Sequence, residues 1–465
     1  MTIDLWALTE LKTIDLGDTR LNSRIVSLLI TLSSNVQASI ATACKNIAET
    51  KAAYRLFSNP KTNMEKVMTP HRDSTLERIA QEKVVVIAQD TTQLDFTGKR
   101  TAKHLGKLCK DFRPGWFFHP SVAFTLEKVC LGVVGYKIWS RDLDYAVTHQ
   151  DRKKVPLEQK ESLRWVEGYQ FASEVSEKCP DTHIVNVADR EGDMYDLYQQ
   201  ALLGHADYVI RAYRPRSMQE KEPHATNTYI KVWDYVSQQP NMGEISFEMS
   251  AREERSARTV TQTVYCANVT LKPPFRKFET LDSVNVNAVM VREENPPEGE
   301  EPVQWLLLTS LPINNLQDVK FILDCYLCRW QIECFFKTLK SGCQVEKIQM
   351  ETPERVQACI ALYIIIAWRI LMMTMLCRVN PEAPCTIVFT DAEWKSVMTV
   401  QTRKLVHTSP PSLLEMVKRV ASFGSYQNRK GDGYPGISAI WMGLQRLSGY
   451  AEAWQVFGPE AKTCG

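Results

Sequence analysis

The chain of 465 residues carries almost no net charge, since 56 Lys and Arg residues stand against 54 Asp and Glu residues. A net charge of +2 does not by itself indicate a nucleic-acid-binding protein. If the protein binds nucleic acid, its basic residues must be concentrated in one part of the surface. Only 8 histidines are present, and no internal repeats or low-complexity tracts occur. Hydrophobic and charged contents of 44% and 24% are those of an ordinary globular protein, and the length predicts two to four domains.

The sequence also lacks a disulfide frame and a second long apolar run. Its 13 cysteines are an odd number without a repeating spacing, and no signal peptide is evident, which predicts free thiols in a reducing cytoplasm. Cys325 and Cys328 have a zinc-like spacing, but on a helix Cys334 points away from Cys325, so we do not expect a zinc site. Residues 358–376 are strongly apolar but include Arg369, which favours a buried helix over a membrane span.

The order of the expected elements indicates an α/β core with helical regions on either side. Residues 1–67 contain short amphipathic helices, and the last hundred residues are mostly helical. Expected strands and helices lie between them, at residues 83–89, 119–124 and 129–138, then a helix at 156–175, a strand at 183–188, a helix to about 203 and a strand at 208–212. This order is that of a ribonuclease-H-like sheet. Alternating apolar residues between about 215 and 303 predict a β-rich insertion, and residues 304–310 return to the core.

The chemistry-bearing residues are acids at strand ends and a helix that follows them. Asp90 and Asp189 each end a run of β-branched and apolar residues, where carboxylates reach the edge of the sheet at which α/β sites concentrate. Glu333 lies on a helix expected over about 315–340. At about 100° per residue, it shares a face with Tyr326, Arg329 and Lys340.

Three such carboxylates can hold two Mg²⁺ ions, and flanking cations can bind phosphates, so the pattern indicates chemistry on a phosphodiester backbone. A structural role is the alternative for each acid, because an Asp directly after a strand most often forms a turn or caps a helix. Asp95 competes with Asp90 for the role. Glu191 and Asp193 compete with Asp189, although the dipole of the following helix already explains them.

The spacing Y-x2-R-x3-E-x6-K of Tyr326, Arg329, Glu333 and Lys340 resembles the signature of the insertion-sequence-four family of DDE transposases, in particular the Tn-five type. Further segments resemble blocks of the same family, in the expected order. They are Leu16-Gly-Asp-Thr-Arg20, Ala53-Tyr-Arg-Leu-Phe57, Asp90-Thr-Thr, Val187-Ala-Asp-Arg-Glu191, Trp305-Leu-Leu-Leu-Thr-Ser310 and Ile437-Ser-Ala-Ile-Trp441.

The resemblance implies a fold and an activity. The fold is a ribonuclease-H-like catalytic core, residues 68–360, with the β-rich insertion at about 215–303. A helical DNA-end recognition domain, residues 1–67, and a helical dimerisation domain, residues 361–465, flank it. The activity is cut-and-paste DNA transposition by a homodimer that acts with Mg²⁺, or Mn²⁺ in its place, on bacterial nucleoid DNA. Its steps are cleavage at inverted-repeat ends, a hairpin intermediate and joining of the 3′ ends to target DNA.

The resemblance also implies residue roles. Asp90, Asp189 and Glu333 would be the catalytic metal ligands. Residues implied to contact DNA are Tyr326, Arg329 and Lys340 at the phosphates near the scissile bond, Trp305 at a flipped base, Arg211 at the transferred end, and Arg20, Arg24 and Arg55 in the end-recognition domain.

Two other functions fit the same residues. A transposase relative that binds DNA ends as a regulator would lack the chemistry, but the three acids are all present, which argues against it. A ribonuclease-H-like, structure-specific nuclease would cut without end specificity, and the N-terminal helical region and the Trp305 segment argue for transposition over it.

Overall fold

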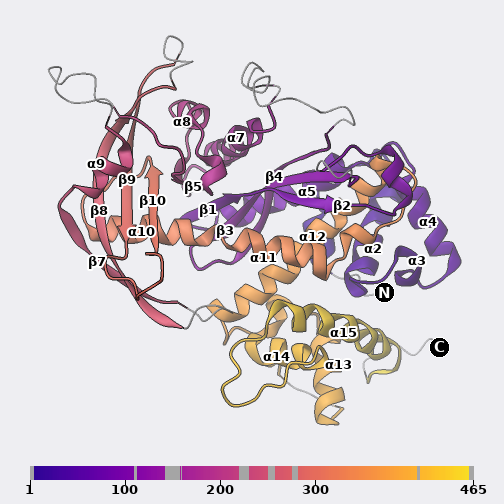
Figure 1. Ribbon diagram of the computed structural model, residues 1–465. Helices are drawn as coiled ribbons and strands as arrows, with labels where there is room; N and C mark the ends of the chain where they lie inside the picture. The colour runs from indigo at the N-terminus through magenta and orange to yellow at the C-terminus, as the bar shows by residue number, and fades with distance from the viewer. Residues whose placement is uncertain are drawn as a thin grey trace. The chain divides into compact units, whose positions relative to one another are not determined.

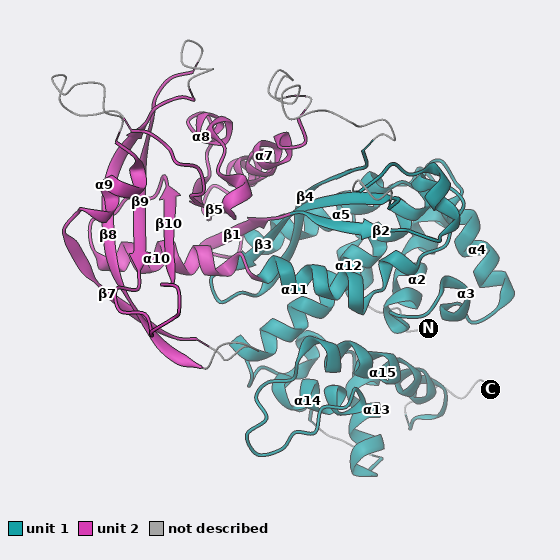
Figure 2. Ribbon diagram, viewed as in Figure 1, with its two compact units in different colours: residues 1–79, 91–146, 331–465 teal, residues 80–90, 147–330 magenta. Residues whose placement is uncertain are grey.

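The computed structural model describes residues 5–108, 113–141, 158, 160–218, 230–249, 257–274, 281–405 and 409–459 (Figure 1). The chain divides into two units (Figure 2). Unit 1 comprises residues 1–79, 91–146 and 331–465, and unit 2 comprises residues 80–90 and 147–330. Unit 2 therefore takes its first strand from a short segment that lies within the sequence of unit 1.

Unit 1 is mainly helical. Its N-terminal helices are α1 (Leu5–Glu10), α2 (Thr19–Ser34), α3 (Ile40–Ala43), α4 (Ile47–Phe57) and α5 (Met64–Ile79). Three strands follow, β2 (Thr92–Asp95), β3 (Gly115–Thr125) and β4 (Cys130–Trp139), with the short helix η1 (Arg100–His104) between the first two. Both β2 and β4 pair antiparallel with β3.

The C-terminal part of unit 1 is helical, as expected. It contains α11 (Gln331–Lys337), η5 (Thr338–Gly342), η6 (Val345–Lys347), α12 (Pro353–Val379), η7 (Cys385–Ile387), α13 (Asp391–Thr402), α14 (Leu413–Phe423) and α15 (Ile437–Phe457). Helix α12 is the centre of the unit, because it packs on α2, α5, α15 and β4. It is long and apolar enough to cross a membrane, with a mean hydropathy of 2.1, yet 83% of its most apolar window is buried inside the protein. The expectation of a buried helix at this position is confirmed.

Unit 2 is built on a mixed sheet. Its strands are β1 (Val84–Gln89), β5 (His183–Ala188), β6 (Asp207–Arg211), β7 (Asn241–Met249), β8 (Arg258–Leu271), β9 (Val284–Arg292) and β10 (Gln304–Thr309). Their order is β1-β5-β6-β10-β9-β8-β7, in which β1, β5 and β6 are parallel and the later pairs are antiparallel. The helical elements are α7 (Leu163–Lys178), η3 (Arg190–Gly192), α8 (Tyr195–Ala201), α9 (Val232–Ser237) and α10 (Leu316–Cys328).

Most sequence-based strands are confirmed, and two elements differ. Strand β5 has the expected bounds, and the β-rich insertion continues the sheet through β10. Helix α7 begins at Leu163, while the expected start, residue 156, lies outside the described residues. Strand β2 was not expected, because only Leu94 of its four residues is buried and the apolar signal is short.

The single helix expected over about 315–340 is wrong. Helix α10 ends at Cys328, where the N–H of Arg329 bonds to the carbonyl of Tyr326, three residues back. Helix α11 resumes at Gln331 and passes into the π-helix η5, in which the N–H of Cys343 bonds to Thr338, five residues back. A periodicity of 100° per residue therefore does not describe the segment that carries Lys340.

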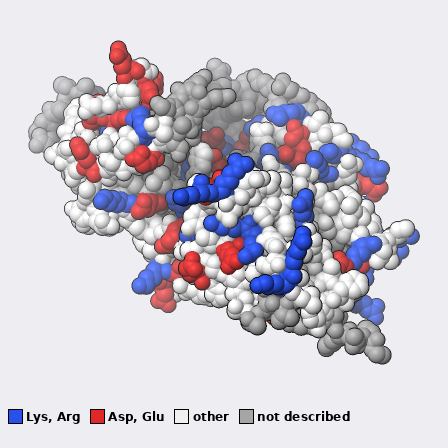
Figure 3. Space-filling model, turned by 90° about the horizontal axis from the view of Figure 1, so that it is seen from below, with Lys and Arg blue, Asp and Glu red and all other residues white. Residues whose placement is uncertain are grey.

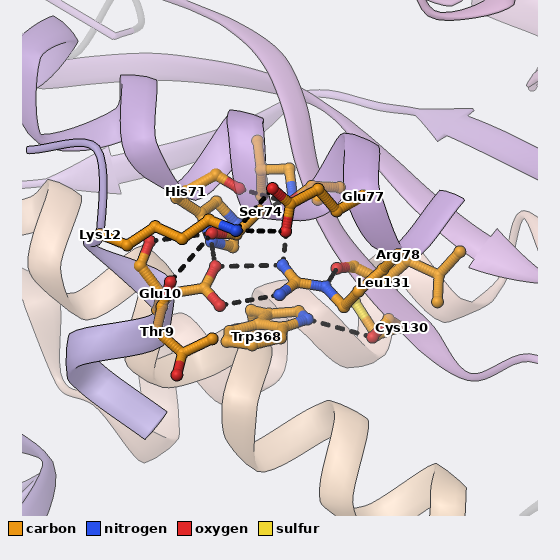
Figure 4. Close-up of polar contacts among 12 residues, drawn as sticks. Thr9, Glu10, Lys12, His71, Ser74, Glu77, Arg78, Cys130, Leu131 and Trp368 are labelled. Carbon is orange, nitrogen blue, oxygen red and sulfur yellow. Dashed lines mark hydrogen bonds and ion pairs between the residues drawn. The ribbon is translucent and has the colours of Figure 1, made fainter. Parts of the chain in front are cut away.

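A buried charge cluster ties helix α1 to the rest of unit 1 (Figure 4). Glu10 is 2% exposed, His71 is fully buried, and the carboxylate bonds to Nδ1 of the ring. The other ring nitrogen, Nε2, accepts from the N–H of Val133 at 3.0 Å. Arg78 donates to both carboxylate oxygens of Glu10 at 2.8 and 3.0 Å and lies over the ring of Trp368 at 4.1 Å. Since Nε2 accepts, His71 is the neutral tautomer with its proton on Nδ1.

The two titrating groups of this cluster shift in the same direction. Burial lowers the pKa of His71, as do Arg78 and Arg72, although Glu10 opposes them. Burial alone raises the pKa of Glu10, but His71 and Arg78 outweigh it and leave the pKa below its ordinary value. A lowered pKa in the folded state means that the unfolded chain binds protons more readily. The contribution of Glu10 and His71 to the free energy of unfolding is therefore fully present above their ordinary pKa values, and it is lost as the pH falls below them.

A second buried ion pair fixes the segment after β6 in unit 2. Asp193 is 1% exposed, and Arg216 donates to its Oδ1 from Nε at 2.6 Å. The hydroxyl of Tyr198 donates to the same oxygen at 2.9 Å. The N–H groups of Tyr213 and Arg214 donate to Oδ2 at 2.9 and 2.7 Å. Asp193 thus holds the chain that leaves β6 against the chain that leaves β5, which begins with Asp189.

We expect His71→Gln to lower the thermal midpoint near pH 7.5, because a buried hydrogen-bond pair is disturbed at a cost of about 1–3 kcal/mol. The midpoint of the variant should also depend less on pH below about 6.5, the ordinary pKa of histidine. In the wild-type protein, proton uptake by His71 on unfolding removes up to about 1.4 kcal/mol per pH unit in that window. Thermal melts of both proteins at several pH values test this, with the exposed His104→Gln as control. Equal pH slopes for wild type and His71→Gln would contradict it.

Asp193→Ala should destabilise the protein by about 3–5 kcal/mol, because it leaves the buried guanidinium of Arg216 without its partner. The matched variant Asp181→Ala removes an exposed carboxylate from the same unit and should change stability by no more than about 0.5 kcal/mol. Chemical denaturation of the three proteins gives the comparison. A similar small effect of both variants would show that the Asp193 pair does not hold the fold.

Candidate active site

Two of the three expected acids lie at one edge of the sheet of unit 2. Strands β1 and β5 pair in parallel from Val84 with His183 to Ala88 with Val187. Two residues beyond the last pair, the same offset sets Asp90 opposite Asp189. Adjacent strands lie about 4.8 Å apart, so the two carboxylates share one small region at the carboxyl ends of the strands.

Arginines flank this pair of acids. Nη1 of Arg329, which follows helix α10, donates to Oδ2 of Asp90 at 3.3 Å. Arg164, in the first turn of α7, pairs with Glu191 at 2.9 Å. Burial lowers the pKa of Arg164, while Glu191, Glu161, Asp189 and Asp90 act to raise it, so both acids lie within its electrostatic reach. Arg164 was missed in the sequence, because the expected helix began at residue 156 and placed it in the third turn, whereas α7 begins at Leu163 and places it in the first turn, where the helix dipole disfavours a cation.

A buried amide fixes the strand ends beneath the acids. Gln89, directly before Asp90, is fully buried, and its Nε2 donates to Oδ1 of Asn186 at 3.0 Å and to the carbonyl of Trp165 at 3.3 Å. A Cβ at Gly168 would lie 2.1 Å from Oε1 of Gln89, so glycine is needed for α7 to approach β1. These contacts join β1, β5 and α7 immediately beside the two carboxylates.

The competing acids have structural partners. Oδ1 of Asp95 accepts the N–H of Thr97 at 2.8 Å, and Arg113 lies 3.4 Å from Oδ2. Burial alone raises the pKa of Asp95, but the bonds from Thr97 and the charge of Arg113 outweigh it and lower the pKa. Asp193 belongs to the buried pair with Arg216. Asp189 itself accepts the N–H of Glu191 at 2.8 Å, as the cap of η3, and its carboxylate is half-buried at the strand end.

Glu333 and Lys340 belong to unit 1. Glu333 is half-buried in the first turn of α11. Lys340 donates from Nζ to the carbonyl of Gln93 at 2.8 Å and lies 3.4 Å from Glu346, so β2 and η6 hold its amine.

Among the residues that the structure describes, no group of three or more His, Cys, Asp or Glu side chains is close enough to hold a metal ion. The donors themselves suit one, because hard divalent cations prefer carboxylate oxygens.

Aromatic rings gather around Trp305 at the start of β10. Its ring is stacked with Phe247 at 6.5 Å between centroids and tilted against Tyr326 at 5.8 Å. Trp305 is half-buried, whereas Tyr326 is 6% exposed. The phenol of Tyr326 is therefore packed, and its ring helps to hold Trp305 in place.

The other expected DNA contacts are more exposed. Arg211 ends β6 and is half-buried, while Arg20, Arg24 and Arg55 on α2 and α4 are exposed. Arg20 and Arg24 line a cavity of about 870 Å³ in unit 1 that is also lined by residues of α12, α13 and α15. Figure 3 shows Lys and Arg side chains in several groups on one face, interspersed with Asp and Glu. On this face, the described residues therefore form no single concentrated basic surface.

Cys325 and Cys328 are both buried. Burial raises the pKa of Cys325, which disfavours the thiolate that zinc needs.

Comparisons with known proteins give matches along the chain. Residues 3–62 match the family described as transposase DNA-binding, residues 163–369 match the transposase DDE domain, and residues 365–458 match the transposase Tn5 dimerisation domain. Among solved structures, the chain is similar to the cryo-EM structure of the piggyBac transposase synaptic complex with hairpin DNA, at 11% identity and a TM-score of 0.31. That match covers 85% of this chain and 60% of the other, and at this TM-score it carries no argument.

The family matches agree with the mixed α/β architecture. A DDE domain implies a ribonuclease-H-like core, and its match includes Asp189 and Glu333. DDE domains typically use divalent metal ions, which the carboxylate donors suit. With a DNA-binding match before the DDE domain and a Tn5 dimerisation match after it, the chain belongs to the Tn5-like DDE transposases.

Proposed function

We propose that this transposase moves its element by a cut-and-paste reaction. It binds the inverted-repeat ends, cleaves them by metal-dependent hydrolysis through a hairpin intermediate, and joins the 3′ ends to target DNA. The observation that carries the proposal is the parallel register that sets Asp90 opposite Asp189 at the carboxyl ends of β1 and β5. A pair of acids on rigid neighbouring strands is the arrangement that metal-dependent phosphodiester chemistry needs.

The proposed metal ligands are Asp90, Asp189 and Glu333, holding two Mg²⁺ ions for which Mn²⁺ can substitute. Bound metal would lower the pKa of the attacking water or 3′-hydroxyl and stabilise the leaving 3′-oxygen. Gln89 and Asn186 join β1 and β5 near their ends, which supports a fixed spacing of Asp90 and Asp189 before substrate binds. No histidine general base is assigned in this scheme, in a chain with 8 histidines.

The remaining residues handle DNA. Arg329 and Lys340 would bind phosphates near the scissile bond, and their present partners, Asp90 and the Gln93 carbonyl, keep the charged groups in place. Tyr326 would act with them and support Trp305 through the ring contact.

Other cations would contact DNA further from the scissile bond. Arg211 would contact the transferred end. Arg20, Arg24 and Arg55 would contact the element ends from the N-terminal domain, residues 1–67, and their exposure supports this role.

Trp305 would accept a base that is flipped out when the hairpin forms. An aromatic face at a strand start can stack on an extruded base. The stacked ring of Phe247 and the tilted ring of Tyr326 hold Trp305 in one orientation, which favours such stacking.

The active form would be a homodimer on two DNA ends, acting on nucleoid DNA in the bacterial cytoplasm. The match to a Tn5 dimerisation domain over residues 365–458 supports self-association through the C-terminal domain, residues 361–465. The catalytic domain between the two flanking domains would span residues 68–360.

Asp90→Asn and Glu333→Ala should retain binding to element ends and lose every chemical step, because each removes a carboxylate ligand of the metal. The assay incubates purified protein, Mg²⁺ and DNA carrying the element's own ends, which are found as short inverted repeats beside the coding region. Hairpinned ends and strand-transfer products are expected for the wild-type protein. Loss should be at least about 1,000-fold, the scale on which metal-site residues act.

Matched controls separate ligand loss from general damage. Asp95→Asn changes an acid five residues beyond Asp90 that has Thr97 and Arg113 as partners, and Glu351→Ala removes an exposed acid of unit 1. Both should cleave. Cleavage by Glu333→Ala would refute the ligand assignment, binding alone by the wild type would indicate a regulator, and nicking without end specificity would indicate a nuclease.

Trp305→Ala should nick the element ends normally but form hairpins about tenfold more slowly or worse, since stacking on a base contributes about 1–3 kcal/mol. Trp305→Phe keeps an aromatic face and should restore part of the hairpin rate. Denaturing gels resolve nicked from hairpinned products in a single time course. Equal losses of nicking and hairpin formation in Trp305→Ala would argue for a packing role instead.

A further inference from the structure

Arg164 occupies a position that is unfavourable for a cation. It lies in the first turn of α7, where the helix dipole repels positive charge, and its side chain is only 12% exposed. Removing a guanidinium from water costs several kcal/mol unless partners compensate. The fold must therefore supply negative charge at this point.

Four groups supply it. Nη2 of Arg164 pairs with Glu191 at 2.9 Å, and Nη1 donates to the carbonyl of Glu161 at 2.9 Å. Burial lowers the pKa of Arg164, and the groups that oppose this shift are, in order, Glu191, Glu161, Asp189 and Asp90. Glu191 and the Glu161 carbonyl hold the guanidinium of Arg164. The N–H of Glu191 also donates to Oδ1 of Asp189 at 2.8 Å, and the carbonyl of Trp165, the residue after Arg164, accepts from Gln89, which directly precedes Asp90. These bonds place Arg164 beside both acids.

Two ionised aspartates this close together are stabilised by a nearby cation. Carboxylates on adjacent strands repel each other, and like charges at this separation disfavour the doubly ionised state. Arg329 lies against Asp90, and Arg164 reaches both acids from α7, which packs on β1 and β5. A permanent cation here lowers the repulsion between the acids, but it also repels any divalent cation that they bind.

We propose that Arg164 is a positioning residue that balances the charge of Asp90 and Asp189 and thereby sets the affinity of this pair for a divalent cation. The inference rests on the proposed function, in which these acids are metal ligands. Glu191 gives the guanidinium a second anion, so Arg164 stays neutralised when the two aspartates bind metal. Metal affinity is thus kept lower than the bare carboxylates would give.

A purely structural role makes a different prediction. The guanidinium of Arg164 lies 5.3 Å from the centre of the Trp165 ring, so its loss could loosen the start of α7. Loosening would weaken metal binding together with stability. Loss of charge alone would strengthen metal binding, and the sign of the change therefore separates the two roles.

The test is a titration of the full-length protein with Mn²⁺ in the absence of DNA, by calorimetry or electron paramagnetic resonance. Arg164→Met keeps the apolar stem beside Trp165, and Arg164→Gln keeps a hydrogen-bond donor. Both should bind Mn²⁺ about three- to tenfold more tightly than the wild type, the effect of removing one positive charge from the neighbourhood of a divalent cation in a solvated site. Arg164→Lys keeps the charge and should bind as the wild type does.

Controls give each outcome one meaning. Arg292→Gln removes a guanidinium from another ion pair of unit 2, 3.0 Å from Glu294, and should leave Mn²⁺ affinity unchanged. Unchanged or weaker binding by folded Arg164→Met and Arg164→Gln would overturn the inference, as would failure of both variants to fold by circular dichroism. Asp189→Asn should lose Mn²⁺ binding. If it binds as the wild type does, the metal assignment of the proposed function fails, whatever the Arg164 variants show.

Discussion

The parallel pairing of β1 with β5 is the constraint on which the candidate site depends. Parallel strands end at the same edge of a sheet, and the observed register brings two acids 99 positions apart in sequence to one place, because Val84 pairs with His183 and the offset is kept. A shift of one residue would turn one carboxylate to the other face of the sheet. Neither acid alone is distinctive, so the strand pairing is what makes them a site.

Buried polar contacts protect that register from both sides. Gln89 bonds to Asn186 across the two strands and to the Trp165 carbonyl on α7. Asp193, four residues after Asp189, is held by Arg216 and by main-chain N–H groups. A slip of either strand would leave these buried groups without partners, at a cost of about 1–3 kcal/mol each. The residues that look like rivals or bystanders in the sequence therefore serve to keep Asp90 and Asp189 aligned.

The strands were predictable because short runs of mostly apolar, β-branched residues bounded by polar residues have few alternatives, as β1 and β5 show. The segment from Tyr326 to Lys340 was not, because its backbone changes from an i−3 bond at Arg329 to an i−5 bond at Cys343, and side-chain periodicity does not encode that change. Arg164 was missed for a related reason. Its ion-pair partner Glu191 is distant in sequence, and only the packing of α7 on β1 and β5 brings the two together.

The near-neutral composition follows from how the cations are held. Arg329 is paired with Asp90, Arg164 with Glu191, and Lys340 with Glu346 and a carbonyl. An exposed basic surface of the same size would gather any polyanion and would repel itself in the folded state. Cations held by local carboxylates stay ordered, and in the proposed function they would exchange those partners for phosphate only where the geometry fits. A DNA-processing site of this kind needs no excess of positive charge in the whole chain, which is why the total of +2 gives no sign of it.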